Sequence, residues 1–450
     1  MTLIKFIAKR IIIASPPSII AEDILPRLAW NLARTIDTVI QNWSLEISDN
    51  FSKKDWIEIQ AAKTGRLLYH AKSAIPFWKE FSKTTKPKPK ESLKDLKDLP
   101  IISRTKVKQL SIDQLATQNL LNSRRAVSAA TSGSTGEPLK FFQDTRDTFR
   151  RDINTYQEFR YTGNVLKYPI LILGLQTHAD LDRWGRRFTS EDLYDPIARK
   201  EIYKFISLEK PYVLIGTPSL IQIFASFAEK DARKVTFIMV MYRGEHLERR
   251  EREKLSSFFH APLFGNYGTR ECSIIGIQCK EKNFHLTPWM NFVEIVDANG
   301  QQQLPEVEGE IIVTHFENFV MPFIRYKIGD RGMIHSTPCP CGRQTKTITF
   351  TGRDSITVET PSGKHIPFLR ISSAVAQNFA KDVQSFQIEQ KNSEIIFRCV
   401  PMTTNSSLNE NNLKKILGDI FAGEMQIKVE KVLRIQPNEN GKTPSFIKRF

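Results

Sequence analysis

The middle of the chain alternates between short apolar runs and amphipathic segments. Residues 213–216 and 235–241 are continuous apolar runs, which is typical of strands buried on both faces of a sheet. Residues 218–230, between these runs, and residues 247–259, after them, repeat apolar side chains at helical spacing. This strand–helix–strand–helix order predicts a parallel sheet with helices on both faces, and ligands of such sheets bind beyond the carboxyl ends of the strands.

The rest of the chain follows different patterns. Residues 1–100 form a mainly helical lead-in by their apolar spacing, and residues 286–351 form a β-rich region of short strands separated by turn signals. Residues 352–450 alternate again between strands and helices, over a length that suits an independent domain. The predicted fold class is therefore α/β. A large N-terminal domain over residues 1–351 has parallel sheets and a small barrel-like β region, and a small α+β domain follows it.

Composition narrows the class of protein. A chain of 450 residues with 40% hydrophobic residues is typical of a globular protein with two or three domains. Its net charge of +16 favours an anionic partner, such as nucleic acid, an anionic membrane face or an anionic substrate. Nucleic acid is not expected, because the charge is not accompanied by a recognition module. Five cysteines do not make a secreted disulfide framework, so the cytoplasm is the default location.

The N-terminus is apolar but interrupted by charge. Lys5, Lys9 and Arg10 break the run, and a proline pair ends it at residues 16–17. This stretch is too short and too charged to span a membrane. An amphipathic helix that caps the protein body is favoured over one that lies on a membrane surface. Membrane contact is therefore expected to be at most peripheral, through the N-terminus.

A glycine- and hydroxyl-rich stretch lies between two predicted strands. Its glycines allow sharp turns, and its N–H groups and hydroxyls can form a concave anion site that suits a polyphosphate. It is not a Walker loop, because Gly-Lys-Ser/Thr does not follow. An ordinary hairpin turn of the same composition is the alternative. The stretch comprises Thr131, Ser132, Gly133, Ser134, Thr135 and Gly136, followed by Glu137 and Pro138.

Five short motifs occur in an order that resembles adenylate-forming enzymes, and more closely their phenylacetate–CoA ligase/CapK-like branch. Each motif is weak alone, but together they cover nearly the whole chain. The resemblance implies that a carboxylate attacks the α-phosphate of ATP to give an acyl-adenylate and pyrophosphate, and that a nucleophile then displaces AMP. The motifs are residues 131–138, 267–271, 325–330, 352–353 and 441–442.

The resemblance also implies an ATP site built from distant segments. The glycine-rich loop would hold the β- and γ-phosphates, Tyr267 and the turn at residues 243–245 would line the adenine pocket, and Asp330 would accept the ribose hydroxyls with Arg353 nearby. The implied ATP-binding residues are Thr131, Ser132, Gly133, Ser134, Thr135, Gly136, Gly244, Glu245, Tyr267, Gly268, Thr269, Asp330 and Arg353.

Two further roles follow from the same resemblance. Glu271 is the implied Mg²⁺ ligand, since hard oxygen donors suit that ion. Lys442 is the implied catalytic lysine, on a mobile small domain that rotates as a lid about residues 352–356. The family usually has acidic residues where this chain has Ser355 and Ile356, so whether Asp354 serves as the hinge stays open.

Each of these roles has a structural alternative. Glu271 could be a helix-start acid, Asp330 a turn residue and Lys442 a solvated lysine of the C-terminal tail.

A separate group of residues has the composition of a metal site. Cys279, His285, Cys339 and Cys341 match the Cys₃His set of a closed structural zinc site. Some relatives in the CapK-like branch carry similar Cys/His pairs here. The alternative is three unrelated reduced thiols and a surface histidine. Zn²⁺ is therefore an expected structural cofactor, beside ATP and Mg²⁺.

The functional prediction is an adenylate-forming ligase for a carboxylic acid. The acceptor is CoA, an amine or sugar, or a carrier thiol, and CoA is therefore a candidate co-substrate. A catalytically silent nucleotide-binding or scaffold protein of the same fold is the alternative, and a basic RNA-binding protein is a third class. The sequence leaves the acid, the acceptor, the pathway and the oligomeric state open.

Overall fold

The chain divides into two compact units. The first contains residues 1–130 and 140–352, and the second begins at Arg353.

Among the described residues, no helix has the length and apolar character needed to cross a bilayer. The computed structural model describes residues 2–14, 44–81, 93–123, 125–130, 139–163, 169–174, 185–189, 192–193, 195–245, 247, 249–353, 357–379, 382–401, 408–436 and 445–449.

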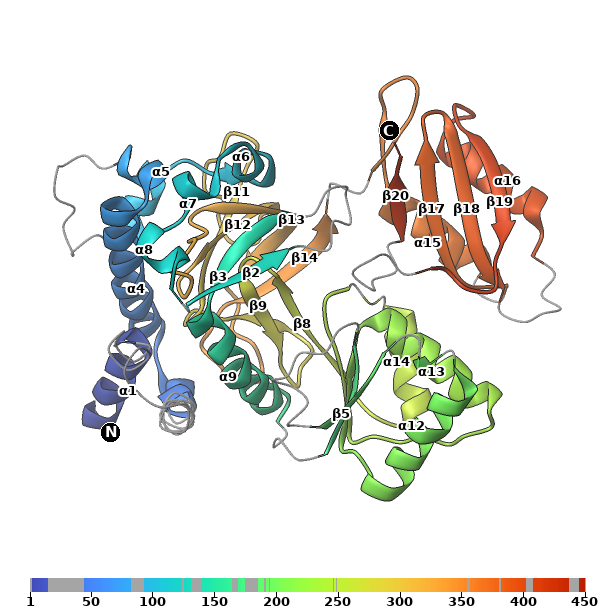
Figure 1. Ribbon diagram of the computed structural model, residues 1–450, viewed down its shortest axis with the longest axis horizontal. Helices are drawn as coiled ribbons and strands as arrows, with labels where there is room; N and C mark the ends of the chain where they lie inside the picture. Colours follow the sequence, from blue (N-terminus) through green and yellow to red (C-terminus); the bar gives the residue numbers. More distant parts are fainter. Residues whose placement is uncertain are drawn as a thin grey trace. The chain divides into compact units, whose positions relative to one another are not determined.

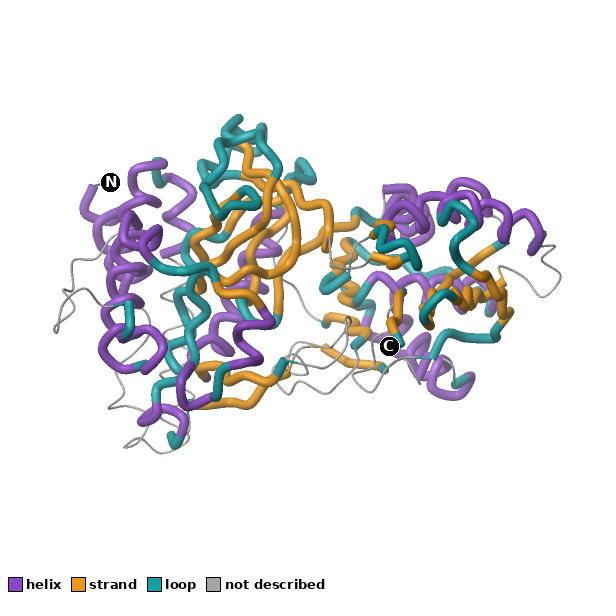
Figure 2. The backbone as a smooth tube through the Cα atoms, turned by 90° about the horizontal axis from the view of Figure 1, so that it is seen from above, coloured by secondary structure: helices purple, strands orange, loops and turns teal. Residues whose placement is uncertain are grey.

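The N-terminal part of the first unit is helical, and its helices lie beside the strands of a large sheet (Figure 2). Helix α1 buries Ala8 and Ile12, and Lys9 forms an ion pair with Asp55 of α4 at 2.6 Å. Helix α1 thus packs on the first unit through Ala8 and Ile12, whereas Ile4, Phe6 and Ile7 stay exposed, so its role as a cap remains a prediction. The helices are α1 (Thr2–Ala14), α4 (Lys53–Ala74), α5 (Pro76–Lys79), α6 (Arg104–Gln109), α7 (Ile112–Leu115) and α8 (Gln118–Leu121), with 3₁₀ turns η1 (Ser48–Asn50) and η2 (Leu93–Asp98).

A parallel sheet follows in the order β5-β4-β6-β7-β8. Figure 1 labels its strands β5 and β8, with α12, α13 and α14 beside β5. One face packs on α12, α13 and α14, and the other packs on Phe159 of α9, so helices cover both faces as predicted. The elements are β4 (Ile170–Leu173), β5 (Gly185–Phe188), β6 (Val213–Gly216), β7 (Met239–Tyr242), β8 (Leu263–Thr269), α9 (Thr145–Thr162), α12 (Pro196–Glu209), α13 (Pro218–Lys230) and α14 (Arg249–Phe259).

The apolar run at residues 235–241 is longer than the strand it contains. The strand itself spans only Met239–Tyr242. Ile238, just before it, is about half exposed, and its N–H donates to the carbonyl oxygen of Tyr212, the residue before β6, at 2.9 Å. Val235 and Phe237 are buried in the core without belonging to the strand. Apolar side chains can therefore be buried against the helices at positions that precede the hydrogen-bonded strand in the sequence.

Strand β8 connects the parallel sheet to an antiparallel region. Its first half pairs parallel to β7 and its second half pairs antiparallel to β9. Within the described residues the strand order is open, running from β11 through β12, β13, β14, β10 and β9 to β8. The strands are β9 (Ser273–Gln278), β10 (Phe284–Leu286), β11 (Asn291–Val296), β12 (Gly309–His315), β13 (Tyr326–His335) and β14 (Thr347–Arg353), and the short β1 (Ile102–Ser103) pairs parallel to β13.

The two strands of a separate hairpin flank the glycine-rich stretch. Strands β2 (Ala126–Ala130) and β3 (Lys140–Asp144) pair antiparallel, with Ala130 opposite Lys140. Residues 131–138 themselves lie outside the described residues. The hairpin agrees with the prediction that two strands flank this stretch.

The second unit is a small α+β body. Its four strands follow the order β19-β18-β17-β20, and a core of apolar side chains joins them to α15 and α16. The elements are β15 (Thr357–Glu359), β16 (His365–Pro367), α15 (Phe368–Phe379), β17 (Val383–Lys391), β18 (Glu394–Pro401), α16 (Glu410–Ile420), β19 (Gln426–Lys431) and β20 (Phe446–Lys448).

Candidate functional site

Two motifs of the candidate ATP site meet in the first unit. The hydroxyl of Tyr267, on β8, donates a hydrogen bond to Oδ2 of Asp330, on β13, at 2.8 Å. The hydroxyl of Tyr326, also on β13, donates to Oε1 of Glu271 at 3.0 Å. All four side chains are buried. The structure therefore joins these motifs, far apart in sequence, by two buried hydrogen bonds.

The ring of Tyr267 is held on one side by an aromatic neighbour. It stacks on Phe350 of β14, with the ring centroids 3.9 Å apart and the planes 12° apart. The next residue, Gly268, has no room for a side chain, because an added Cβ would lie 2.2 Å from the carbonyl oxygen of Ser273. This packing fixes the tyrosine ring and explains the glycine beside it.

Glu271 lies in a turn between β8 and β9. Oγ1 of Thr269 accepts a hydrogen bond from the N–H of Cys272 at 3.0 Å, which closes this turn. Because a strand follows, the alternative that Glu271 is a helix-start acid is wrong. Nη1 of Arg104 lies 3.9 Å from its Oε1. Burial and the neighbouring Glu271 carboxylate raise the pKa of Tyr326, so this hydroxyl stays protonated and donates. The site thus presents a hard carboxylate of the kind that suits Mg²⁺.

Asp330 lies on a bulge inside β13. Glu310 of β12 pairs with Arg331 of β13, and Ile312 pairs with Lys327. Between these pairs, three residues of β13 therefore lie opposite one residue of β12. Gly329 sits in this bulge with a φ of +89°. The alternative that Asp330 is a turn residue is wrong, because the strand continues to His335. Bulges re-aim side chains and are common beside active sites, and here the bulge carries the carboxylate that meets Tyr267.

The predicted adenine-side turn follows the carboxyl end of β7. The N–H of Arg243 donates to the carbonyl oxygen of Gly216, at the end of β6, at 3.0 Å. Gly244 has a φ of +78°, which its lack of a side chain permits, and Glu245 comes next. The turn therefore lies where open α/β sheets bind ligands, as the sequence predicts.

Several predicted residues lie outside the described part of the structure. These include the whole glycine-rich loop from Thr131 to Gly136, and Lys442. Arg353 is the last residue of β14, and its side chain also lies outside the described part. Their implied roles remain predictions.

Two residues at this site were not predicted from the sequence. Arg104 lies beside Glu271, and Glu158 of α9 contacts both Arg243 and Asn266. The sequence gives no signal for either, since a charged residue in a polar helix resembles its solvated neighbours.

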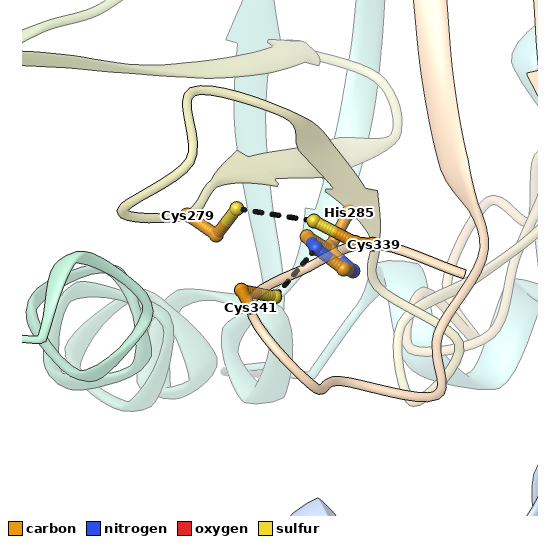
Figure 3. A group of neighbouring side chains, drawn as sticks. All are labelled: Cys279, His285, Cys339 and Cys341. Atoms are coloured by element: carbon orange, nitrogen blue, oxygen red, sulfur yellow. Dashed lines mark hydrogen bonds between the residues drawn. The ribbon is translucent and has the colours of Figure 1, made fainter. Parts of the chain in front are cut away.

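The four predicted metal ligands form one cluster (Figure 3). Cys279 directly follows the strand β9, His285 lies on β10, and Cys339 and Cys341 lie in the loop before β14. Their ligand atoms all lie within 4.8 Å of one another. The Sγ atoms of Cys279 and Cys339 are 3.7 Å apart, and Sγ of Cys341 is 3.2 Å from Nε2 of His285. Two thiolates on a tetrahedral Zn²⁺, with Zn–S about 2.3 Å, lie about 3.8 Å apart, so the residues fit a zinc ion.

Surrounding groups hold these ligands in place. Nδ1 of His285 faces the carbonyl oxygen and the hydroxyl of Thr345, at 3.1 and 2.9 Å, which leaves Nε2 directed at the sulfurs. Asn283 donates to the Cys339 sulfur at 3.2 Å. Gly342, with a φ of +90°, closes the turn through its N–H, which donates to the Cys339 carbonyl oxygen at 3.0 Å. Such outer contacts are what orients histidine and thiolate ligands in metal sites.

Comparisons with known proteins show which solved structures share the fold of this chain. No protein-family model matches the chain. The Staphylococcus aureus protein CapK is 21% identical over 384 residues, which is 81% of this chain and 82% of CapK. The solved structure of 2-hydroxyisobutyryl-CoA ligase, in a postadenylation state with an acyl-adenylate, has a TM-score of 0.69 at 15% identity and covers 90% of this chain and 92% of its own. The amide bond synthetase McbA from Marinactinospora thermotolerans has a TM-score of 0.50 at 15% identity, covering 71% of this chain and 67% of its own.

The chain therefore has the fold of the adenylate-forming ligases. This confirms the fold class predicted from the sequence.

Proposed function

We propose that this chain is an ATP-dependent adenylate-forming ligase that activates a carboxylic acid. The observation that carries the proposal is the buried pairing of Tyr267 with Asp330 and of Tyr326 with Glu271. These contacts join the two motifs to which the resemblance assigns adenine, ribose and Mg²⁺. The likeness in fold to an acyl-CoA ligase solved with an acyl-adenylate supports the same reaction class.

In the proposed reaction, a carboxylate oxygen bonds to the α-phosphorus of ATP and the bond to pyrophosphate breaks. Tyr267 lines the adenine side, Asp330 accepts the ribose hydroxyls, and the loop at residues 131–136 holds the outer phosphates. Mg²⁺, when bound to Glu271, supplies positive charge for the leaving pyrophosphate. Lys442 adds positive charge at the α-phosphate, on a C-terminal unit that acts as a lid and turns near residue 352.

The acceptor in the second half-reaction is a thiol or an amine. 2-Hydroxyisobutyryl-CoA ligase has been solved with CoA in its thioesterification state, and McbA is an amide bond synthetase. The net charge of +16 suits a polyanionic acceptor such as CoA. Incubating a preformed acyl-adenylate complex with CoA, and separately with a panel of primary amines, distinguishes the two classes by product mass, when each rate is compared with that of the free acyl-adenylate.

The first half-reaction is tested by pyrophosphate release over a panel of carboxylic acids. Lys442→Ala is expected to lose adenylation while keeping ATP affinity, because the lysine acts on the reacting phosphate. Lys448→Ala is the matched control, since Lys448 lies in the same unit and pairs with Glu359 at 2.7 Å. Equal rates in wild type and Lys442→Ala would remove this lysine from the mechanism, and ATP binding without turnover of any acid would favour a silent scaffold.

We also propose that the cluster of Cys279, His285, Cys339 and Cys341 holds one structural Zn²⁺. The support is the gathering of all four ligand atoms within 4.8 Å, with no open position implied. Elemental analysis is expected to give about one zinc per chain in wild type. Cys339→Ser should lose it and Cys272→Ser, at a buried thiol outside the cluster, should keep it. Protein without zinc in both the wild type and Cys272→Ser would end this proposal.

A further inference from the structure

Glu158 lies between two segments of the proposed nucleotide site. It is on α9, which belongs to none of the five motifs, and only 1% of its surface is exposed. Its Oε1 accepts a hydrogen bond from Nδ2 of Asn266 at 2.7 Å. Its Oε2 pairs with Nη2 of Arg243. Asn266 directly precedes Tyr267, and Arg243 directly precedes the turn at Gly244.

A buried carboxylate in this position needs its partners. Removing a charge from water is unfavourable by several kcal/mol unless opposite charge and hydrogen bonds replace the lost hydration. Burial raises the pKa of Glu158, while Arg243 and Asn266 act in the opposite direction. Glu158 is therefore a buried carboxylate held by two side chains rather than a solvated helix residue.

The helix that carries Glu158 is fixed at its carboxyl end. The carbonyl oxygen of Tyr161 accepts from the N–H of Lys280 at 3.0 Å, and that of Arg160 accepts from Nη2 of Arg343 at 3.2 Å. The Arg343 guanidinium also lies 3.9 Å from the centre of the Tyr161 ring. Lys280 follows Cys279, and Arg343 comes two residues after Cys341. The last turn of α9 is thus attached to the segments that carry the metal ligands.

The helix is also fixed at its other end. It begins directly after β3, and Nε2 of Gln143 on that strand donates to the carbonyl oxygen of Arg270 at 2.9 Å. With both ends attached, α9 presents the Glu158 carboxylate at a defined place against the sheet.

We propose that Glu158 is a positioning residue of the nucleotide site, whose carboxylate holds Asn266 and Arg243 so that Tyr267 and the Gly244–Glu245 turn keep their binding geometry. The inference rests on the proposed function. Glu158 touches neither nucleotide nor acid in this scheme and acts only through its two partners. A purely structural ion pair would affect folding stability alone, whereas a positioning residue also changes ATP affinity.

Glu158→Gln tests the idea, because Gln keeps the size and an acceptor oxygen but removes the charge that Arg243 needs. We expect KM for ATP to rise about 10- to 100-fold, as befits one charged hydrogen-bond contact. KM for the acid should stay within about threefold of wild type, a smaller change than the loss of one charged hydrogen bond would cause. Glu317→Gln is the matched control, since Glu317 is equally buried and pairs with Lys63 on a different helix. It should lower the melting temperature without raising KM for ATP.

A second variant covers the case in which Glu158→Gln does not fold. Asn266→Ala removes the donor and should raise KM for ATP in the same way. When both variants fold, their double variant should lose less than the sum of the single losses, because the two residues act through one contact. Direct ATP titration by calorimetry on the full chain accompanies the kinetics.

The outcomes separate the two proposals. If wild type binds ATP and releases pyrophosphate, but Glu158→Gln and Asn266→Ala match the affinity of Glu317→Gln, Glu158 has no positioning role. If wild-type protein does not bind ATP at all, the proposed function fails, and this inference fails with it.

Discussion

The ion pair between Arg125 and Asp144 closes the base of the β2–β3 hairpin. Nη2 of Arg125 pairs with Oδ2 of Asp144, and Nε donates to Oδ1 at 3.3 Å, so the contact is bidentate. The side chains are 5% and 0% exposed, respectively. The carbonyl oxygen of Arg125 also accepts from the N–H of Thr145, the first residue of α9, at 2.8 Å. This pair therefore holds the two strands that flank the predicted phosphate loop.

Replacing Asp144 by Asn leaves the Arg125 charge buried without its counter-ion. Removing one partner of a buried pair is destabilising by about 3–5 kcal/mol. For a unit of about 340 residues, with an unfolding entropy of about 2.1 cal/mol/K per residue, this corresponds to a melting temperature lower by about 4–7 °C. Urea unfolding and calorimetry of the same preparation measure both quantities.

Two controls make the comparison specific. The double variant Arg125→Met/Asp144→Leu removes both charges and should recover most of the loss, because apolar side chains of similar volume can replace a buried pair. Glu253→Gln breaks the exposed pair with Arg249 and should leave the melting temperature close to that of the wild type. A loss below about 1 kcal/mol for Asp144→Asn would refute the reasoning, since the pair would then behave as a surface contact.

Three further predictions follow from other contacts. Tyr267→Phe keeps the stack on Phe350 but removes the hydrogen bond to Asp330, so we expect a stability loss of about 1 kcal/mol and weaker ATP binding by titration; unchanged affinity would show that this contact does not shape the site. Chelation of the proposed zinc should expose the amides of the last turn of α9 and of residues 279–285 to hydrogen exchange before the rest of the first unit, and uniform exchange would contradict a local role. Burial acts to raise the pKa of Asp55, but hydrogen bonds from Lys9 and Ser52 lower it to about 2, below its ordinary value of 3.8. Its ion pair therefore stabilises the fold above about pH 4 and loses this effect as the pH falls towards 2; the difference in melting temperature between wild type and Asp55→Asn should shrink over that range, and a difference independent of pH would contradict the assignment.

Local pattern was sufficient for the parallel sheet. The apolar runs at residues 213–216 and 239–241 are buried on both faces, and the amphipathic segments between and after them are α13 and α14. The pattern failed where burial and strand pairing separate, as at residues 235–237, because the hydrophobic effect depends on area removed from water and not on backbone hydrogen bonds.

The structural alternatives for Glu271 and Asp330 fail for a reason that sequence does not contain. Strand β8 exchanges its parallel partner β7 for an antiparallel partner β9 along its length, so Glu271 lies between strands rather than before a helix. Asp330, which precedes Gly332, could have been a turn residue, but it lies beside a bulge at Gly329 inside the continuous strand β13.

By itself, the sequence determined the fold class, the order of the motifs and the identity of the four metal-ligand candidates, because these depend on residue type and spacing along the chain. Only the tertiary structure decided that Tyr267 meets Asp330, that the cluster closes to within 4.8 Å, and that Glu158 joins Asn266 to Arg243. The physical reason is that a buried charge is tolerated only beside its partners. Strand order and helix packing bring those partners to Glu158 from 85 and 108 residues away in the sequence.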